Sequence, residues 1–401
     1  MFINIDQFIK DHITSRQTTF FAEDIAQNQQ RLSEEIKGKK VLVIGGAGTI
    51  GSSYIKALLP FNPSSLIVVD YSENGLTELT RDLRSQDIYI PEEYITYPFD
   101  FGSPVFEKMF KARKFDIVAC FAAHKHVRSE KDHLAIEAMI TNNVFNTKKL
   151  IDLALENKPK HFFSVSTDKA ANPVNVMGGS KKLMENVLMA FSGDLKITTA
   201  RFANVAFSNG SLLAGFIDRL MKRQPLSAPN DVKRYFVSPE ESGQLCLLAS
   251  IMGASSDIFF PKLKTSQMMT FSAIAERFLR NLGYEPDLCS TEEEAKQKAS
   301  RWIPDKKSYP VYFFKTDTSG EKSYEEFFTN EDVVNMDQFE ALGVINNPHL
   351  PSKESVLETI ASFKQLFDSK DVVKAAVVDL LSKHIQGFRH IETGKNLDSK
   401  M

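Results

Sequence analysis

The feature that most constrains the fold is a run of glycines between an apolar segment and a helical pattern. Residues 41–44 are apolar, residues 45–51 have the spacing Gly-x-x-Gly-x-x-Gly, and residues 52–59 have helical periodicity. Glycines permit a tight turn and a close backbone approach to a ligand, and the first N–H groups of a helix bind phosphate. The residues of this turn that we expect to contact such a ligand are Gly45, Gly48, Thr49, Ile50 and Gly51.

Short apolar runs alternate with helix-length amphipathic segments from residue 39 to about residue 205. This alternation is typical of βαβ units, in which crossover helices join parallel strands. We therefore predict an α/β fold with a doubly wound, Rossmann-like parallel sheet, whose ligand binds outside the carboxyl ends of the strands. The six expected strands cover residues 41–44, 66–69, 95–99, 117–121, 161–165 and 197–202.

An acidic residue ends the second expected strand. Asp70 lies 19 residues after Gly51, close to the spacing at which a carboxylate accepts hydrogen bonds from an adenosine ribose. A carboxylate there repels a 2′-phosphate, so the pattern favours NAD over NADP. The alternative is a glycine turn made only for packing, with an aspartate that caps the next helix.

The chain divides into four expected regions. Apolar positions at helical spacing predict helices at both ends, and the regular strand–helix alternation weakens after about residue 205. The regions are a helical N-terminal extension at 1–37, an NAD-binding Rossmann domain at 38–205, a smaller, mainly substrate-binding region at 206–350, and a helical C-terminal extension at 351–401.

One helix of the third region has a defined start. Ser238 and Glu241 have the spacing of a capping box, in which the serine caps the helix and the glutamate reaches back to the first backbone N–H. This pair predicts a helix over residues 239–252.

Composition limits the partners of the chain. Lys and Arg number 49 against 51 Asp and Glu, so a net charge of -2 gives no general attraction to nucleic acid or an anionic membrane. No stretch approaches the roughly 18 to 20 apolar residues that cross a bilayer. The N-terminus lacks a basic leader followed by an apolar run. We therefore expect a soluble protein without membrane insertion or nucleic-acid binding.

Cysteine and histidine usage predicts neither a disulfide framework nor a metal site. The three cysteines form no close-spaced pair, which fits a reducing, cytoplasmic location. His124, Lys125 and His126 form a cluster, but the motif supplies no carboxylate or cysteine to complete a metal ligand set.

The glycine spacing resembles that of extended short-chain dehydrogenases/reductases. This resemblance implies that Asp100 and Phe101, after the third expected strand, contact the adenine of the cofactor. It also implies that Ala122 and Ala123, after the fourth, run beside the cofactor.

Three reactive side chains end the fifth expected strand. Thr167, Asp168 and Lys169 are consecutive, and they lie at the edge of the sheet where a ligand is expected. Taken alone, Asp168 and Lys169 are also compatible with an ordinary surface ion pair before a turn, which contributes little energy.

Residues 166–181 resemble the signature of bacterial polysaccharide-biosynthesis 4,6-dehydratases that act on UDP-N-acetylglucosamine. Further motifs of that group occur in the same order, so the resemblance spans roughly residues 38–330; they cover residues 122–127, 201–205, 234–236 and 320–326.

This resemblance implies a nucleotide-sugar substrate and a retained NAD. We also expect the protein to form a homo-oligomer. It assigns Lys169 as the base at C5, Asp168 as the acid for the leaving hydroxyl and Thr167 as the hydrogen-bond partner of the C4 oxygen. It places Lys181 at the nicotinamide ribose. The expected substrate-binding residues are Lys125, His126, Asn204, Arg234 and Glu321.

The chain departs from the family pattern at two places. Extended members carry Tyr-x-x-x-Lys, but here Met177 stands four residues before Lys181, and a thioether cannot take a proton. Asp168, or water relayed towards Lys181, is then the candidate acceptor of the C4 hydroxyl proton, and Met177 can equally be a core residue. Thr318 and Ser319 replace an Arg-Pro pair that precedes Gly-Glu-Lys in relatives.

Two alternatives to the dehydratase remain at this stage. A sugar-nucleotide 4-epimerase uses the same oxidation at C4 but needs no acid for a leaving hydroxyl, so the Asp168–Lys169 pair argues for elimination. A non-catalytic NAD-binding protein is disfavoured because Thr167, Asp168, Lys169 and Lys181 are all present.

Overall fold

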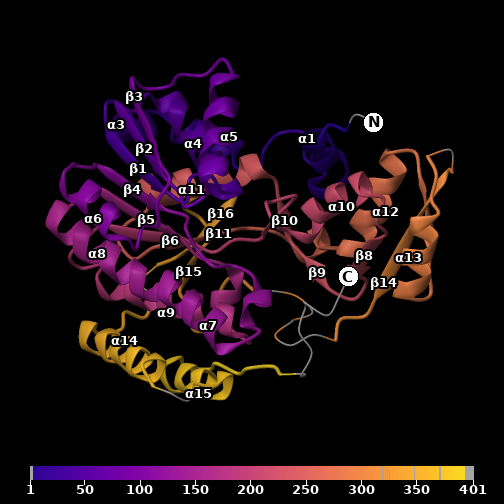
Figure 1. The fold of residues 1–401 in the computed structure, drawn as a ribbon. Helices are drawn as coiled ribbons and strands as arrows, with labels where there is room; N and C mark the ends of the chain where they lie inside the picture. Colours follow the sequence, from indigo (N-terminus) through magenta and orange to yellow (C-terminus); the bar gives the residue numbers. More distant parts are fainter. Residues whose placement is uncertain are drawn as a thin grey trace.

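A nine-stranded sheet, in the order β15-β16-β11-β6-β5-β4-β1-β2-β3, forms the centre of the described part of the chain (Figure 1). The computed structural model describes residues 3–304, 306–317, 320, 322, 324, 326–346, 348–369 and 372–392. The six predicted strands are confirmed and run parallel to their neighbours; they are β1 (Lys40–Ile44), β2 (Ser65–Val69), β3 (Glu93–Tyr97), β4 (Ile117–Cys120), β5 (His161–Val165) and β6 (Ile197–Ala200).

Helices cover both faces of this sheet, which is why β2, β4, β5 and β6 are buried along their whole length. On one face α4 (Thr49–Leu58) packs against α11 (Pro239–Met252). On the other, α8 (Asn146–Asn157) packs between α6 (Pro104–Lys111) and α9 (Val176–Ala190). The helix α5 (Glu73–Arg84) joins β2 to β3, and the predicted doubly wound α/β fold is confirmed.

The helical pattern over residues 134–156 is interrupted. It forms α7 (His133–Ile140), a π-helical turn at Thr141–Phe145 and then α8. Such turns often accompany functional sites. Here the turn carries the buried side chain of Asn143.

The predicted boundary at residue 205 does not coincide with the edge of the sheet. Three later strands extend it: β11 (Ile258–Pro261) is parallel to β6, whereas β16 (Leu342–Ile345) and β15 (Val334–Asn335) are antiparallel additions. Because β11 has only four residues, all buried, its apolar run resembles any short buried segment. The region after residue 205 therefore contributes strands to the nine-stranded sheet, which forms the first lobe, and also forms most of a second lobe.

The second lobe has its own core and a three-stranded sheet, in the order β13-β14-β8. Two short strand pairs form separate two-stranded sheets, and Figure 1 shows the second lobe at the right of the nine-stranded sheet. Its elements are β7 (Asn204–Val205), α10 (Leu212–Met221), β8 (Leu226–Pro229), β9 (Lys233–Arg234), β10 (Phe236–Val237), β12 (Met269–Thr270), α12 (Phe271–Asn281), β13 (Glu285–Leu288), α13 (Glu292–Ser300) and β14 (Ser308–Phe314).

The N-terminal extension packs on both lobes. The helix α1 (Ile5–Phe8) and the π-helix Ile9–Thr14 belong to the second core through Phe8, Ile9 and Ile13, whereas α2 (Ala22–Gln27) and α3 (Gln29–Ile36) lie against the main core. Between them, Arg16 forms two 2.8 Å hydrogen bonds with Glu241. Glu241 also completes the predicted capping box with Ser238, which is confirmed.

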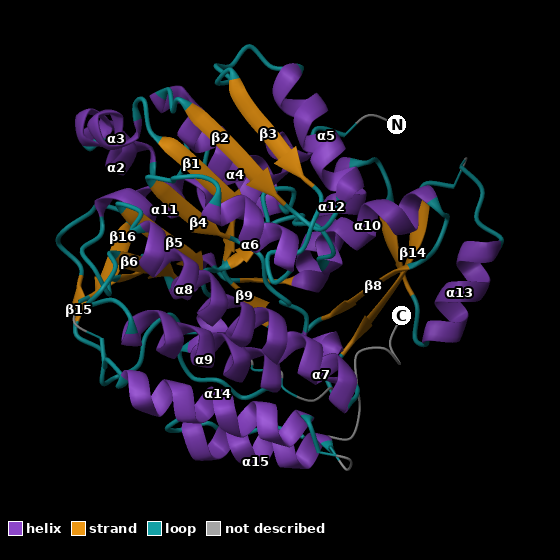
Figure 2. Cartoon of the chain, turned by 60° about the vertical axis from the view of Figure 1, so that its left-hand side comes forward, coloured by secondary structure: helices purple, strands orange, loops and turns teal. Residues whose placement is uncertain are grey.

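Two C-terminal helices form an additional layer. The helices α14 (Lys353–Phe367) and α15 (Lys374–His384) lie against each other and against α9 (Figure 2). The last part of the predicted C-terminal extension, residues 393–401, lies outside the described residues. No helix in the described part of the chain combines the length and the apolar character that a membrane crossing needs.

Two glycines in helices test how closely α4 packs against α11. A Cβ atom at Gly243 in α11 would lie 2.2 Å from the carbonyl oxygen of Ser53 in α4, but a Cβ at Gly215 in α10 would meet nothing within 4 Å. We expect Gly243→Ala to lower the free energy of unfolding by about 1–3 kcal/mol, because the helices must separate. Gly215→Ala should be neutral or stabilising by up to about 1 kcal/mol. Chemical denaturation checks both, and equal effects would contradict the packing argument.

Candidate active site

The glycine-rich turn lies directly against the end of β4. Gly45 has φ +76°, and a Cβ atom there would lie 2.5 Å from the backbone nitrogen of Ala122. A Cβ at Gly51 would lie 2.3 Å from the carbonyl oxygen of Gly45. Only glycine fits at these two positions. The nearest atom to a Cβ at Gly48 is 3.4 Å away, and no described side chain caps α4 there, so its first N–H groups are suited to a phosphate.

Asp70 fixes this turn to the end of β2. Its buried carboxylate accepts hydrogen bonds from the backbone N–H of Ala47 at 3.0 Å and from that of Ser72 at 2.9 Å. The next helix, α5, is capped by the Ser72 hydroxyl rather than by Asp70. A carboxylate has about four acceptor positions, so Asp70 retains capacity for ribose hydroxyls.

The segments after β3 and β4 differ in their exposure to solvent. Asp100 is exposed and accepts a hydrogen bond from Gly102 N–H at 2.5 Å, whereas the Phe101 ring is buried against Phe106. Ala122 and Ala123 are half-buried after β4.

Sequence reasoning missed Asn143, which anchors the segment after β4 to α9. Its Oδ1 accepts from His124 N–H at 2.9 Å, and its Nδ2 donates to the His124 carbonyl at 2.9 Å and to Ser180 Oγ at 3.0 Å. The sequence signal was weak, because Asn143 follows the polar residues Thr141 and Asn142, and nothing local shows which of these side chains is buried.

Thr167 and Lys169 both donate hydrogen bonds to one carboxylate oxygen of Asp168. Asp168 Oδ1 accepts hydrogen bonds from Thr167 Oγ1 at 2.8 Å, from Lys169 N–H at 2.9 Å and from Lys169 Nζ at 3.2 Å. Asp168 is buried, and the Lys169 side chain is 20% exposed. The carboxylate and the amine are therefore placed to act as a coupled acid–base pair.

Met177 and Lys181 lie on α9, and both are buried. Lys181 Nζ donates to the Val165 carbonyl at 2.7 Å, at the end of β5. Burial lowers the pKa of Lys181 to about 8. Met177 donates its backbone N–H to Glu130 Oε1 at 2.9 Å, within the first turn of the helix. Four residues apart, Met177 and Lys181 share one face of α9.

The predicted substrate-binding residues divide between two places. Lys125 Nζ donates to the Asn209 carbonyl at 3.2 Å, and Asn209 N–H donates to Thr49 Oγ1 at 2.9 Å. His126 lies beside Gly210, whose Cβ would be 3.2 Å from the histidine Nε2. The loop at 209–210 therefore joins the end of β4 to the start of α4. Lys125 is exposed as a whole, but local desolvation lowers the pKa of its amine.

Arg234 and Asn204 belong to the short strands between the lobes. Arg234 is buried, and its Nη1 donates to the carbonyls of Lys233 and Lys322 at 3.0 Å each. Asn204 is half-buried in β7. Glu321, Thr318 and Ser319 lie outside the described residues. Within the described chain, no group of three or more His, Cys, Asp or Glu side chains is placed to hold a metal ion.

A cavity of about 690 Å³ lies beside Ala171 and Asn172, which follow Thr167, Asp168 and Lys169 in the chain. It is lined by α9, by the segment 326–333 and by the C-terminal helices, and it includes Asn172, Glu185 and Arg201 but not Thr167, Asp168 or Lys169. This cavity is therefore distinct from the space at the strand ends.

Comparison with known proteins places the chain in a family. Residues 41–347 match the profile of a family described as polysaccharide biosynthesis protein. The chain belongs to this polysaccharide biosynthesis family. A protein of Methanocaldococcus jannaschii, named an uncharacterized membrane protein, is 31% identical over 79% of this chain and 88% of its own.

Other family relatives have more specific names. The capsular polysaccharide biosynthesis protein CapD of Staphylococcus aureus is 27% identical over 74% of this chain, which spans about half (49%) of that protein's length. A UDP-N-acetylglucosamine 4,6-dehydratase (inverting) of Campylobacter jejuni is 26% identical over 62% of this chain and 73% of its own. A UDP-glucose 4-epimerase of Rickettsia rickettsii is 30% identical over 57% of this chain and 67% of its own length.

Solved structures share the fold. The structure of Pen from Bacillus thuringiensis superposes with a TM-score of 0.62 at 20% identity, covering 82% of this chain and 98% of its own. A dTDP-glucose 4,6-dehydratase of Streptomyces venezuelae, solved with NAD, has a TM-score of 0.55 at 17% identity, covering 81% and 97%. The family protein is therefore built on the same Rossmann-like scaffold.

The buried Lys181 makes the stability of this family protein depend on pH. Its pKa falls from 10.5 in the unfolded chain to about 8 in the folded one, so the unfolded state holds the extra proton between these values. Stability must then rise with pH across that interval. We expect Lys181→Met to be more stable than the wild type at pH 7, by roughly 3 kcal/mol. This advantage should shrink from pH 8 to 10.5. Denaturation at several pH values checks this, and a difference independent of pH would contradict it.

Proposed function

We propose that the chain is an NAD-dependent nucleotide-sugar 4,6-dehydratase for surface polysaccharide or glycan biosynthesis. Its substrate is UDP-N-acetylglucosamine, and its product is the UDP-linked 4-keto-6-deoxy-N-acetylhexosamine. The observation that carries this proposal is that Thr167 and Lys169 both donate hydrogen bonds to one carboxylate oxygen of Asp168, just after the end of β5. Family membership and the named Campylobacter relative support it.

NAD fits the residues of the first lobe. Gly45 and Gly51 leave no room for a Cβ, Gly48 starts a helix of ten residues, and Asp70 is positioned to accept from a ribose. When bound, NAD supplies hydride acceptance from C4 and hydride return to C6. Because the second transfer reverses the first, the cycle leaves the cofactor oxidised, and the protein has no need to release it.

Elimination follows from the acid–base pair. Once C4 is a ketone, the C5 proton is acidic, and the Lys169 amine takes it. The C5–H electron pair forms the C5–C6 double bond while Asp168 protonates the C6 hydroxyl, which leaves as water. When substrate is bound, the Thr167 hydroxyl would turn from Asp168 Oδ1 and donate its hydrogen bond to the C4 oxygen, where negative charge develops. The Lys169 ammonium would then return a proton to C5, so the net change would be the loss of one water.

The C4 hydroxyl proton needs an acceptor other than Met177. Asp168 lies in the same cluster, and its carboxylate can take the proton that it later gives to the C6 hydroxyl. Water relayed towards Lys181 is the second route, since a pKa of about 8 leaves a fraction of that amine neutral at physiological pH. Lys181 otherwise adds positive charge near the developing alkoxide.

Substrate binding is assigned to both lobes. Lys125 and His126 lie near the start of α4, and Arg234 is suited to the diphosphate because guanidinium groups bind phosphate in a bidentate manner. Asn204 and Glu321 complete the set of proposed substrate-binding residues. We propose a cytoplasmic homo-oligomer as the working form.

A sugar-nucleotide 4-epimerase is the second candidate. The Rickettsia relative, a UDP-glucose 4-epimerase, supports it as strongly as the Campylobacter relative supports the dehydratase. An epimerase needs oxidation at C4 but neither a base at C5 nor an acid at C6. The buried Asp168 in contact with Lys169 therefore favours elimination.

Product mass separates these functions. Purified protein incubated with UDP-N-acetylglucosamine should yield a product lighter by one water, as measured by mass spectrometry. A product of unchanged mass with inverted C4 would instead establish the epimerase. No conversion of UDP- or GDP-linked N-acetylglucosamine, despite bound NAD, would establish the non-catalytic alternative.

The amine of Lys169 gives a direct prediction. Lys169→Ala should reduce dehydration by roughly 10²- to 10⁴-fold, which is the usual contribution of a general base. Bound NAD should remain, because the amine contacts Asp168 and lies away from Asp70. Turnover and nucleotide released by heat check both parts. Near-wild-type dehydration would show that another group is the base at C5.

Met177 tests whether the missing tyrosine matters. Because Asp168 or relayed water already accepts the C4 proton, Met177→Tyr should leave turnover unchanged or lower it, with overpacking in this buried position costing about 1–3 kcal/mol of stability. Asp168→Asn keeps the shape but loses the proton carrier, so its turnover should be far lower. A gain of about tenfold in Met177→Tyr, about 1.4 kcal/mol of barrier, would mean that the wild-type site lacks its base.

A further inference from the structure

A buried ion pair lies directly beneath the catalytic segment. Arg201, 1% exposed, binds both carboxylate oxygens of Glu185, with Nε–Oε1 at 3.0 Å and Nη2–Oε2 at 2.8 Å. Burial alone raises the pKa of Glu185, but the opposing effects of Arg201, Lys182 and Ser166 lower it to about 2. The pair is therefore charged at any physiological pH.

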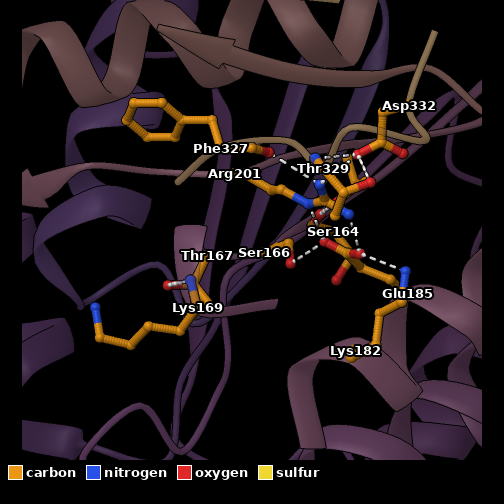
Figure 3. A network of polar contacts seen from close by, with 11 residues as sticks. Ser164, Ser166, Thr167, Lys169, Lys182, Glu185, Arg201, Phe327, Thr329 and Asp332 are labelled. Carbon is orange, nitrogen blue, oxygen red and sulfur yellow. Dashed lines mark hydrogen bonds and ion pairs between the residues drawn. The ribbon is translucent and has the colours of Figure 1, made fainter. Parts of the chain in front are cut away.

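This ion pair contacts two separate segments. On one side, Ser166 Oγ donates to Glu185 Oε1 at 2.6 Å, a distance typical of a charge-assisted bond. On the other, Arg201 Nη1 donates to the Phe327 carbonyl at 2.9 Å and lies 3.6 Å from Asp332 Oδ2. Figure 3 shows both arms of the network.

The second segment, residues 326–332, is held together around Asp332. The Asp332 carboxylate accepts from Thr329 N–H at 2.7 Å and from Thr329 Oγ1 at 3.1 Å. A separate contact joins this segment to the loop that follows Lys169, because Asn172 Nδ2 donates to Glu326 Oε2 at 2.9 Å. The segment directly follows the motif at 320–326 in which substrate contact is proposed.

Strand geometry connects Ser166 to the reacting side chains. Thr167 is extended, with φ -150° and ψ 154°, so neighbouring side chains point to opposite sides. Ser166 points into the buried network, and Lys169 extends away from it (Figure 3). Ser166 N–H also donates to the Ala200 carbonyl at 2.8 Å, which aligns this position with the end of β6. Fixing the Ser166 side chain therefore fixes the direction in which Thr167 points.

We propose that Glu185 and Arg201 are positioning residues for the reaction. Through Ser166 they set the direction of Thr167, Asp168 and Lys169, and through Phe327 and Asp332 they set the position of the substrate-side segment. A buried pair is costly to desolvate and adds little stability compared with apolar packing, so a positional role explains its presence. The effect on activity rests on the proposed function, whereas the mechanical link does not.

Ser166→Ala, with Ser164→Ala as its matched control, tests the first arm. Ser164 lies two residues earlier on the same face of β5 and is also buried, and its hydroxyl contacts two sulfur atoms, that of Met184 at 3.8 Å and that of Cys120. We expect Ser166→Ala to lower kcat by about 10- to 100-fold with KM changed less than about twofold, because misplacement of reacting groups affects turnover. Ser164→Ala should change neither value.

Hydrogen exchange of the full chain tests the link without any substrate. Ser166→Ala should speed amide exchange in residues 167–171, and Ser164→Ala should not. Glu185→Gln should speed exchange in residues 167–171 and 326–332 together. If Glu185→Gln does not fold, the two serine variants still decide.

The outcomes separate this proposal from the proposed function. Equal exchange and equal kcat in the two serine variants would overturn the positioning role. If the wild type converts no nucleotide sugar, the proposed function fails, and exchange alone decides the positioning role. Faster exchange limited to Ser166→Ala would then still support it.

Discussion

Close backbone contact between the glycine-rich turn and the end of β4 determines where the rest of the candidate site lies. With Gly45 against Ala122 and Gly51 against Gly45, any side chain at these glycines would separate the turn from the sheet. Asp70 holds the turn from β2, and Asn143 holds the neighbouring segment to α9. The cofactor-binding edge and the helix that carries Met177 and Lys181 are therefore parts of one connected structure.

Local patterns in the sequence predicted much of this arrangement. The six strands, the glycine turn and the capping box at Ser238 depend on neighbouring residues, so each could be recognised from spacing. The extra strands β11 and β16 could not, because they lie outside the regular strand–helix alternation that marked the first six, and a four-residue apolar run has no periodicity of its own. The docking of Phe8 and Ile13 in the second core was likewise hidden, since nothing local names the partner of an apolar helix face.

The candidate site shows the same division. Thr167, Asp168 and Lys169 are consecutive, so their proximity followed from the sequence. The contacts of Glu185 with Ser166 and Arg201 span 19 and 16 residues, and the Arg201–Phe327 contact spans 126 residues. These pairings depend on which strands become neighbours. The relatives include a nucleotide-sugar 4,6-dehydratase and a nucleotide-sugar 4-epimerase. The choice between these two activities for this chain depends on whether Asp168 and Lys169 act at C5 and C6, as proposed.

Deuterium incorporation tests that central claim most directly. The reaction of UDP-N-acetylglucosamine is run in deuterated water, and the product is analysed by NMR at C5 and C6. The dehydratase account predicts loss of the C6 hydroxyl and deuterium at C5, because Lys169 removes the original C5 proton and solvent replaces it. A product that keeps its C6 hydroxyl, with hydrogen unchanged at C5 and C4 inverted, would contradict this account.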